Sequence, residues 1–373
     1  MFRTLSLLFG LVSASFYSSA AWYEATGIAP VVTTTKAARL SALEDALYKA
    51  VSFSGADIGG ISNLRSLLEE GQDEYKFTNH EIRHIVIDKE KTRNDKVHLT
   101  VLFNIYPVAS SCHTDQYKKS LLFGDFQLLS PQQARMGQLY HLGTDFSRIL
   151  SRRVNSESMN LLSVGESRYD FNKRYPERMT MMAQDSNAQY LINGDIVDLT
   201  ATVNDTREEA INRQFAMVLR VYDGKTGHEI FNKNYRKVAT WEFAKTSQVD
   251  TKSARFWESS YGTMVRNISR DVMLDLESEL SCRITLPEIV AKFGDTVTID
   301  LGRIHGVERG DKLSLWHTGS FIDQHGLTRT KVTESDITLT VNRVYENEAE
   351  LDIEQTELGS SIQIGDVLTT YRH

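Results

Sequence analysis

Residues 80–84, HEIRH, form a pattern that can do chemistry, because His-Glu-x-x-His is the signature of a zinc metalloprotease. On a helix, His80 and His84 would stand one turn apart and share a Zn²⁺. Glu81 would then act as general base on the bound water. The motif therefore indicates a hydrolase only if this segment is helical.

The residues around the motif favour a strand instead. Ile85, Val86 and Ile87 follow it, and β-branched runs are typical of strands. In a strand, with a rise of about 3.3 Å per residue, the two histidines lie about 13 Å apart, too far to share one zinc. Arg83 also places a cation between the supposed ligands. We therefore expect solvated hairpin histidines, and a secreted hydrolase is the least favoured function.

The rest of the sequence carries no other catalytic signature. It contains no Gly-x-Ser-x-Gly elbow, no Walker loop and no dinucleotide fingerprint. The Gly-Asp pairs near the C-terminus lack the carboxylate spacing of a calcium loop, and turn chemistry explains them. We predict no catalytic, cofactor-binding or metal-binding residues and no small-molecule substrate. The formal net charge of -7 argues against a nucleic-acid partner.

Cys112 and Cys282 are the two cysteines of the chain. In an exported protein an even pair favours a disulfide, and we predict that these two residues form one. The bridge would close a loop of roughly 170 residues and contribute about 5 kcal/mol before strain is subtracted. A nucleophile pair of Cys112 with His113 is the disfavoured alternative, because sequence neighbours rarely face each other productively.

The N-terminus predicts export. Arg3 precedes an apolar core at residues 5–12, and small residues follow it. We expect residues 1–20 to be a signal peptide, with cleavage after Ala20 or Ala21. The apolar run is shorter than the roughly 20 residues that span a bilayer. The mature protein is therefore expected in an oxidising compartment outside the cytoplasm.

The length of 373 residues, with 41% hydrophobic and 24% charged residues, predicts a multidomain globular protein. We expect an α+β multidomain fold. Its first domain, residues 21–110, is predicted to be a small βααββ unit from hydrophobic periodicity. The expected elements are a strand at 22–28, helices at 35–53 and 58–68, and strands near 75–90 and 96–106.

The middle domain, residues 111–284, alternates helix and strand patterns and is predicted to be the larger α/β domain. Ser130 and Pro131 are a good N-cap and N1 pair for a helix that continues to Leu150. The DGKTG stretch at 223–227 predicts a hairpin loop. Apolar residues spaced by three or four predict a long amphipathic helix at 257–280.

The C-terminal region, residues 285–373, shows short alternating strands separated by Gly and charged turns, with no helical period. This pattern predicts an all-β, barrel-like domain of about five to seven strands.

Taken in order, these segments resemble the flagellar assembly protein T family of polar, sodium-driven flagella. The resemblance covers essentially the whole mature chain. It rests on AWYEATGIAPV, ARLSALEDALYKAV, SPQQARMGQLYHLGTDFS, AQYLINGDIVDL, GRIHGVERGDKLSLW and IQIGDVLTTY.

The resemblance implies a non-enzymatic, periplasmic structural protein of the flagellar basal body. Such a protein would self-associate in the H ring around the LP ring, whose proteins are expected partners. It would also support recruitment of the T-ring proteins MotX and MotY and of the stator, beside the other H-ring proteins FlgO and FlgP. The middle domain resembles the N-terminal α/β domain of the Tol translocation protein B. A soluble periplasmic envelope adaptor unrelated to flagella is the alternative function.

Overall fold

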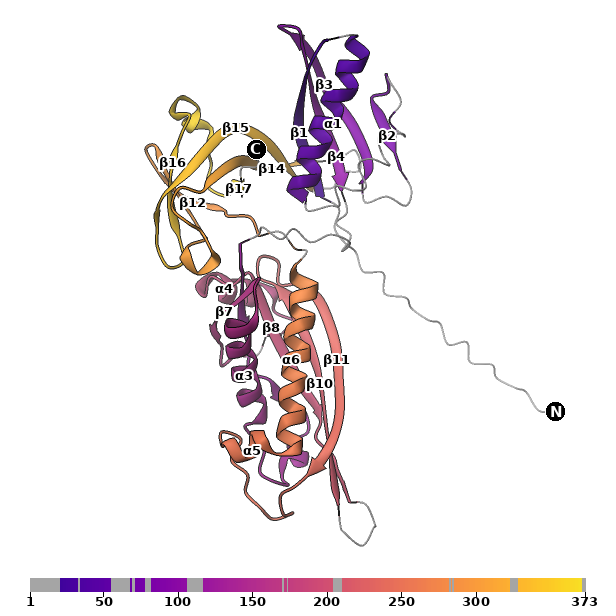
Figure 1. The fold of residues 1–373 in the computed structure, drawn as a ribbon, viewed down its shortest axis with the longest axis vertical. Helices are drawn as coiled ribbons and strands as arrows, with labels where there is room; N and C mark the ends of the chain where they lie inside the picture. Colours follow the sequence, from indigo (N-terminus) through magenta and orange to yellow (C-terminus); the bar gives the residue numbers. More distant parts are fainter. Residues whose placement is uncertain are drawn as a thin grey trace, which may run out of the picture. The chain divides into compact units, whose positions relative to one another are not determined.

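The structure is a computed structural model, and its ribbon is shown in Figure 1. Contacts within the chain divide it into two compact units. The first comprises Met1–Val108 with Gly319–Glu334, and the second comprises Ala109–Thr318 with Ser335–His373. The residues that the structure describes are 21–32, 34–54, 68, 71–77, 82–105, 117–169, 171–172, 174–203, 210–281, 283, 285–322 and 328–370.

The first unit contains an antiparallel sheet in the order β1-β4-β3-β2 with helix α1 packed on it (Figure 1). The predicted strand at 22–28, helix at 35–53 and strand near 96–106 are confirmed. The single strand predicted near 75–90 is wrong, because its two ends belong to β2 and β3, which pair antiparallel, and β3 alone forms the hairpin with β4. The predicted second helix at 58–68 lies outside the described residues, apart from Leu68. The element bounds are β1 (Ala21–Pro30), α1 (Thr35–Ser54), β2 (Glu74–Lys76), β3 (Ile82–Arg93) and β4 (Lys96–Ile105).

Small residues let α1 lie directly on the sheet. Ala42, Ala46 and Ala50 of α1 are fully buried, as is Leu99 on the facing strand β4. Gly27 of β1 is required at the contact, because a Cβ there would stand 1.8 Å from the carbonyl oxygen of Ala42. The helix backbone therefore touches the strand backbone, and this close approach leaves no room for a larger residue.

A strand from the C-terminal region completes the first unit. Strands β14 (Lys312–Ile322) and β15 (Thr328–Val344) pair with each other, and their residues 319–322 and 328–334, here called the arm, belong to this unit. The arm lies beside β1 in parallel register, with Tyr23 opposite Val332. The prediction of only short strands in the C-terminal region is wrong for β15, which has 17 residues.

The middle part of the second unit has a mixed sheet in the order β11-β10-β8-β5-β7. Neighbours around β5 are parallel, whereas β8, β10 and β11 are antiparallel, and a turn at 224–228 joins β10 to β11 as predicted. The strands are β5 (Lys119–Phe123), β6 (Gln127–Leu128), β7 (Leu161–Glu166), β8 (Tyr190–Asp198), β9 (Ala201–Val203), β10 (Ile211–Asp223) and β11 (Glu229–Trp241).

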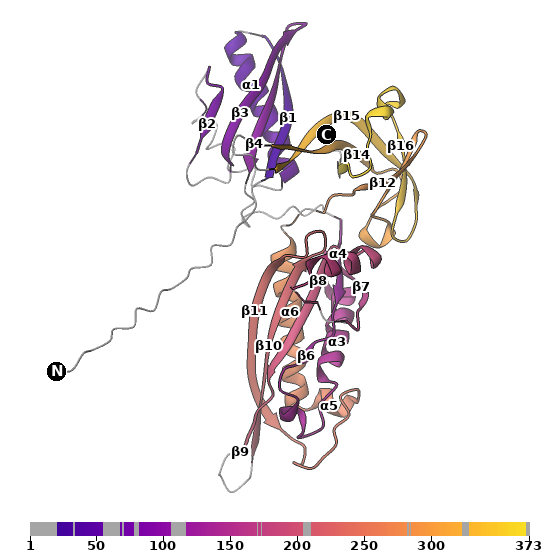
Figure 2. The same cartoon turned by 180° about the vertical axis from the view of Figure 1, so that it is seen from behind.

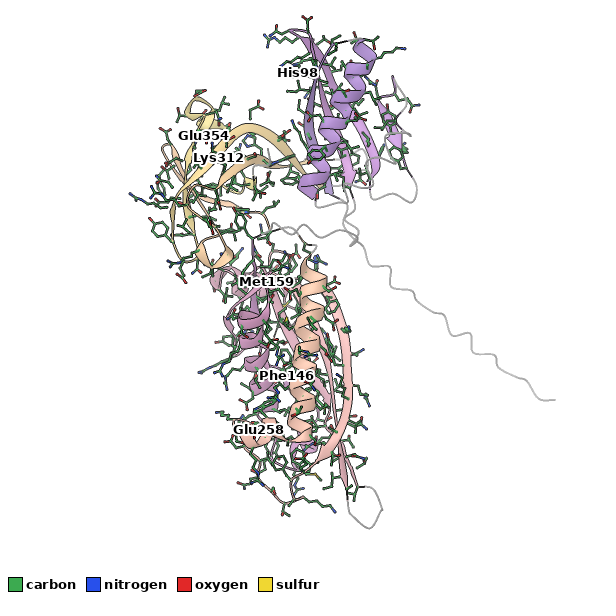
Figure 3. The ribbon with its side chains drawn as sticks, viewed as in Figure 1. His98, Phe146, Met159, Glu258, Lys312 and Glu354 are labelled. Carbon is green, nitrogen blue, oxygen red and sulfur yellow. The ribbon has the colours of Figure 1, made fainter. Side chains whose placement is uncertain are left out.

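Helices α3 (Leu142–Glu157) and α6 (Ser260–Ser281) cover one face of this sheet, and α5 (Ala254–Glu258) leads into α6 (Figure 1). Phe146 of α3, labelled in Figure 3, is fully buried in the shared core. Helix α4 (Pro176–Asp185) packs on Leu191 and Tyr222, which belong to a second, smaller buried cluster of the middle domain. Figure 2 shows α4 at one end of the sheet. The predicted helix at 257–280 is confirmed.

The helix predicted to open at Ser130 is wrong over its first half. Residues Pro131–Ala134 form only a 3₁₀ turn, and the α-helix α3 begins at Leu142. Gly137 and Gln138 separate the two, with left-handed φ angles of 76° and 56°. Two successive residues in this region of φ cannot continue a right-handed helix, so the cap signal produced a single turn.

The C-terminal strands run in the order β12-β13-β16-β15-β14-β17 (Figure 1). They do not form the closed barrel that a barrel-like fold implies, because β17 and the start of β12 share one bridge, between Glu288 and Val367, rather than a ladder. The remaining elements are β12 (Ile289–Phe293), β13 (Thr296–Ile299), β16 (Ala349–Ile353), β17 (Val367–Thr370) and the 3₁₀ turns η2 (Arg303–His305) and η3 (Thr356–Ser361).

Candidate functional site

The described part of the zinc-protease motif is a strand, as its sequence predicts. Ile82 begins β3, and His84 lies in the same strand, whereas His80 and Glu81 lie outside the described residues. His84 Nε2 is 2.7 Å from Oε1 of Glu74, and its ring centre is 5.5 Å from that of Trp22. Hydrogen bonds from Lys76, and then from His84, lower the pKa of the Glu74 carboxyl. The histidine therefore takes part in a cross-strand contact.

The other residues singled out in the sequence are mostly outside the described residues. Cys112 and Cys282 are among these, and so is Ala20. Ala21 is the first residue of β1 and lies opposite Ile105 of β4. The disulfide and the cleavage position therefore stay predictions.

Within the described residues, no three His, Cys, Asp or Glu side chains gather in a group that could hold a metal ion. A hollow of about 330 Å³ lies at the end of the middle domain, lined by Glu242, Phe243, Arg255, Glu258 and Ser259 (Glu258 is labelled in Figure 3). Its carboxylate from Glu242 accepts the backbone N–H of Ser260 at 3.0 Å and so caps the start of α6.

Arg213 of β10 lies at the centre of a buried polar cluster in the middle domain. Its side chain is fully buried, and its guanidinium lies 4.6 Å from the ring centre of Trp241 and 5.6 Å from that of Tyr261. The guanidinium donates to the carbonyls of Gln133 and Met136, both at 2.8 Å. Burial lowers the pKa of this guanidinium. The Arg213 guanidinium therefore binds the loop at 131–139, where a helix was predicted from Ser130.

In the described part of the C-terminal domain, burial shifts the pKa of two titratable groups, His305 and Asp300. Burial lowers the pKa of His305 to about 4, and its Nδ1 accepts the N–H of Gly302 at 3.1 Å. Burial raises the pKa of the Asp300 carboxyl to about 6, although the carboxylate accepts the N–H of Glu288 at 2.7 Å. The carbonyl of His305 also accepts the N–H of Lys118 at 2.9 Å. These contacts hold chain segments together within the second unit.

The edge of β1 that pairs with the arm is the candidate interaction site. Two side chains of α1 form hydrogen bonds with the β1 backbone. The N–H of Ile28 donates to Asp45 at 2.9 Å, and Lys49 donates to the carbonyl of Thr26 at 3.0 Å. Lys49 Nζ also lies 3.3 Å from Glu334 of the arm. Sheet edges are templates for pairing with further strands, and charged side chains limit that pairing. We define this β1-edge site as residues 22–24 with Asp45 and Lys49.

Sequence reasoning missed the β1-edge site. The residues it pairs with stand at the opposite end of the chain, and no local pattern connects them. The available signal was the run TRTKVTESDITLTV at 328–341, which is rich in Thr and other β-branched residues and contains no Gly or Pro that would end a strand.

Comparison with known families gives the class of protein. Models of flagellar assembly protein T match in chain order: the N-terminal domain at residues 21–107, the middle domain at 110–251 and the C-terminal domain at 294–370. The chain therefore belongs to the flagellar assembly protein T family, a family of flagellar structural proteins. No curated protein matches the chain. Within the described residues, no helix is long and apolar enough to cross a membrane.

Solved structures resemble parts of the chain only weakly. The hypothetical protein CT253 from Chlamydia trachomatis is 15% identical and covers 44% of this chain and 98% of its own, with a TM-score of 0.33. A PelC dodecamer from Paraburkholderia phytofirmans is 8% identical and covers 47% and 96%, with a TM-score of 0.28. Lipoprotein GNA1162 from Neisseria meningitidis is 6% identical and covers 42% and 99%, with a TM-score of 0.22. We draw no argument from scores this low.

Proposed function

We propose that this chain is a non-enzymatic, periplasmic scaffold of the flagellar basal body. It self-associates in the H ring around the LP ring and supports recruitment of the T-ring proteins MotX and MotY. The other H-ring proteins, FlgO and FlgP, are its neighbours in this proposal. The observation that carries it is the ordered match of the N-terminal, middle and C-terminal domains of flagellar assembly protein T along one chain.

The proposal includes a division of labour among three domains, at residues 21–110, 111–284 and 285–373. The middle and C-terminal parts have separate hydrophobic cores, which supports independent surfaces for different partners. One domain docks on the basal-body rings while another recruits stator-associated proteins. The middle domain is proposed to be similar to the N-terminal domain of the Tol translocation protein B.

Export and oxidation complete the proposal. Residues 1–20 direct secretion and are removed after Ala20 or Ala21, and Cys112 pairs with Cys282 in the periplasm. The mass of the purified protein before and after reduction measures both features at once. An unprocessed N-terminus or two free thiols would contradict this part of the proposal.

The experiment that tests the scaffold is deletion of the gene in its own host, followed by imaging of the basal body and a swimming assay. Loss of an outer ring with impaired swimming is expected. The full chain should restore both, whereas the matched control lacking residues 1–20 should restore neither. A normal ring with normal swimming would overturn the proposal and favour an envelope adaptor.

Separate deletion of each domain tests the division of labour. The variants should lose ring formation and motility in different combinations, because the proposed partners differ. Identical failure of every variant, each exported and soluble, would contradict separate roles for the domains.

A further inference from the structure

We propose that the β1-edge site is a strand-addition site, and that in the assembled ring it receives residues 331–333 from the arm of a second copy of this chain. The inference rests on the proposed function, because a ring is what places neighbouring copies within reach. In the single chain, the same site receives the chain's own arm.

The pairing at the site is made by the main chain. Trp22 lies opposite Lys331, Tyr23 opposite Val332 and Glu24 opposite Thr333, in parallel register. Strand addition of this kind draws its affinity from backbone hydrogen bonds and its specificity from alternate side chains. Val332, which is only 9% exposed, is the buried side chain of the arm at this register. Every copy carries the same segment, so an arm from a neighbour fits equally well.

Two side chains of α1 limit the length of the site. Asp45 and Lys49 bind the backbone of Ile28 and Thr26, so β1 accepts no further strand beyond Glu24. Lys49 then meets Glu334, the residue directly after the paired segment, at 3.3 Å. The site therefore has a defined end, and an opposite charge marks where the incoming strand must stop.

The arm needs an acceptor strand. Strand β16 pairs with β15 only from Leu339 onward, so the preceding part of β15 has β14 as its partner within the ribbon. A two-stranded ribbon is marginally stable in water, and a third strand stabilises it. Strand β1 supplies this third strand in the first unit.

Among the described residues, the ladder between β1 and the arm is short. It pairs residues 22–24 with residues 331–333, and Lys49 forms an ion pair with Glu334, whose side chains are 31% and 23% exposed. Ion pairs of this exposure contribute little. Exchange of an identical element between copies replaces each lost contact with the same contact, which makes it a low-cost route to assembly.

The test uses two single variants of the full chain, Glu24→Cys and Thr333→Cys, expressed together in the host that lacks the gene. Paired positions on neighbouring strands are within disulfide reach, about 5.5 Å between Cα atoms. Exchange predicts a reducible dimer whose cross-linked peptides join residue 24 of one copy to residue 333 of another. The matched control is the mixture of Thr340→Cys and Asp352→Cys, two positions paired within the C-terminal domain, which should give no dimer.

A second pair of variants avoids substitution of the buried Glu24. Lys49→Glu and Glu334→Lys each place like charges together within one chain, and each should weaken the binding of the arm to β1 by about fivefold, as for the loss of a part-exposed ion pair. Lys49→Glu also loses the hydrogen bond to the carbonyl of Thr26 and the ion pair with Asp45, so the double variant recovers only the ion pair between positions 49 and 334. A mixture of the two single variants restores that ion pair only through exchange. The double variant restores it with or without exchange and sets the level that the mixture should reach.

The outcomes separate this inference from the proposed function. Exchange is supported by a disulfide-linked dimer that joins residue 24 of one copy to residue 333 of another, and by recovery of the binding of the arm in the mixture of Lys49→Glu and Glu334→Lys. Exchange would be overturned if rings form without the dimer and if the mixture of Lys49→Glu and Glu334→Lys stays as weak as the single variants while the double variant recovers. The scaffold proposal would stand in that case. If the wild-type chain forms no ring and the mixture of the two cysteine variants forms no dimer, both the scaffold and the exchange are overturned.

Discussion

Arg213 in the middle domain and Lys49 in the N-terminal domain hold other chain segments by the same chemistry but in opposite environments. Arg213 is fully buried and donates to the carbonyls of Gln133 and Met136. Lys49 is 31% exposed and donates to one carbonyl, that of Thr26, while it also faces carboxylates. Both cations bind backbone oxygen, and burial is the main difference between them.

The difference in burial indicates which contacts between chain segments break only when the domain unfolds. Removing a buried donor leaves carbonyls without a partner and without water, which costs the full desolvation penalty. Removing a half-exposed donor lets water replace it. The loop held by Arg213 is therefore part of the core, whereas the arm beside Lys49 can open without unfolding a domain.

The largest expected effect is from Arg213→Met. The variant should lower the free energy of unfolding by about 4 kcal/mol, because the buried carbonyls lose their charged donors together while the side chain keeps a similar volume. Denaturant unfolding of the purified chain measures it. The matched control is Arg236→Met, whose guanidinium is 62% exposed and should contribute less than about 1 kcal/mol. Equal losses from the two variants would contradict the comparison.

A pH titration tests whether burial also controls the stability that two titratable groups of the C-terminal domain, His305 and Asp300, contribute. The pKa of His305 falls from 6.5 to about 4 in the folded chain, so its contribution to stability is present above pH 6.5 and is lost as pH falls towards 4. The pKa of Asp300 rises from 3.8 to about 6, so its contribution is present below pH 3.8 and is lost as pH rises through 6. Between about pH 4 and 6 the two slopes offset each other.

Variants that remove one group should reveal the other. Relative to the wild type, His305→Gln should gain stability as pH falls from 6 to 4, whereas Asp300→Asn should lose it. Each slope is about 1.4 kcal/mol per pH unit, the value for one proton. Unfolding free energies at pH 4, 5, 6 and 7 measure the slopes. Parallel curves for both variants and the wild type would show that neither group is perturbed by burial.

The smallest expected effect on stability is from Lys49→Met. It should lower the free energy of unfolding by less than about 1 kcal/mol, yet speed amide hydrogen exchange at residues 331–333 as the arm opens. The matched control is Lys312→Met, which breaks an ion pair of 2.9 Å with Glu354 in the second unit; both residues are labelled in Figure 3. If Lys49→Met lowered the free energy of unfolding by several kcal/mol, the contacts of Lys49 would be as essential to the fold as those of Arg213, which would contradict the comparison.

The sequence by itself determined the elements whose signal is local. The period of α1 and α6, the β-branched run after His84 and the DGKTG turn each predicted the structure found, because side-chain periodicity and turn chemistry act within a few residues. The order of segments along the chain also identified the family.

Only the tertiary structure decided the features that join distant residues. Arg213 is buried because the loop at 131–139 presents carbonyls to it, and the same loop ended the helix expected from Ser130. The arm pairs with β1 over three residues, 22–24, because the side chains of Asp45 and Lys49 bind the β1 backbone beyond them. Pairing between opposite ends of a chain depends on which edges the folded domains leave open, and no local pattern records that.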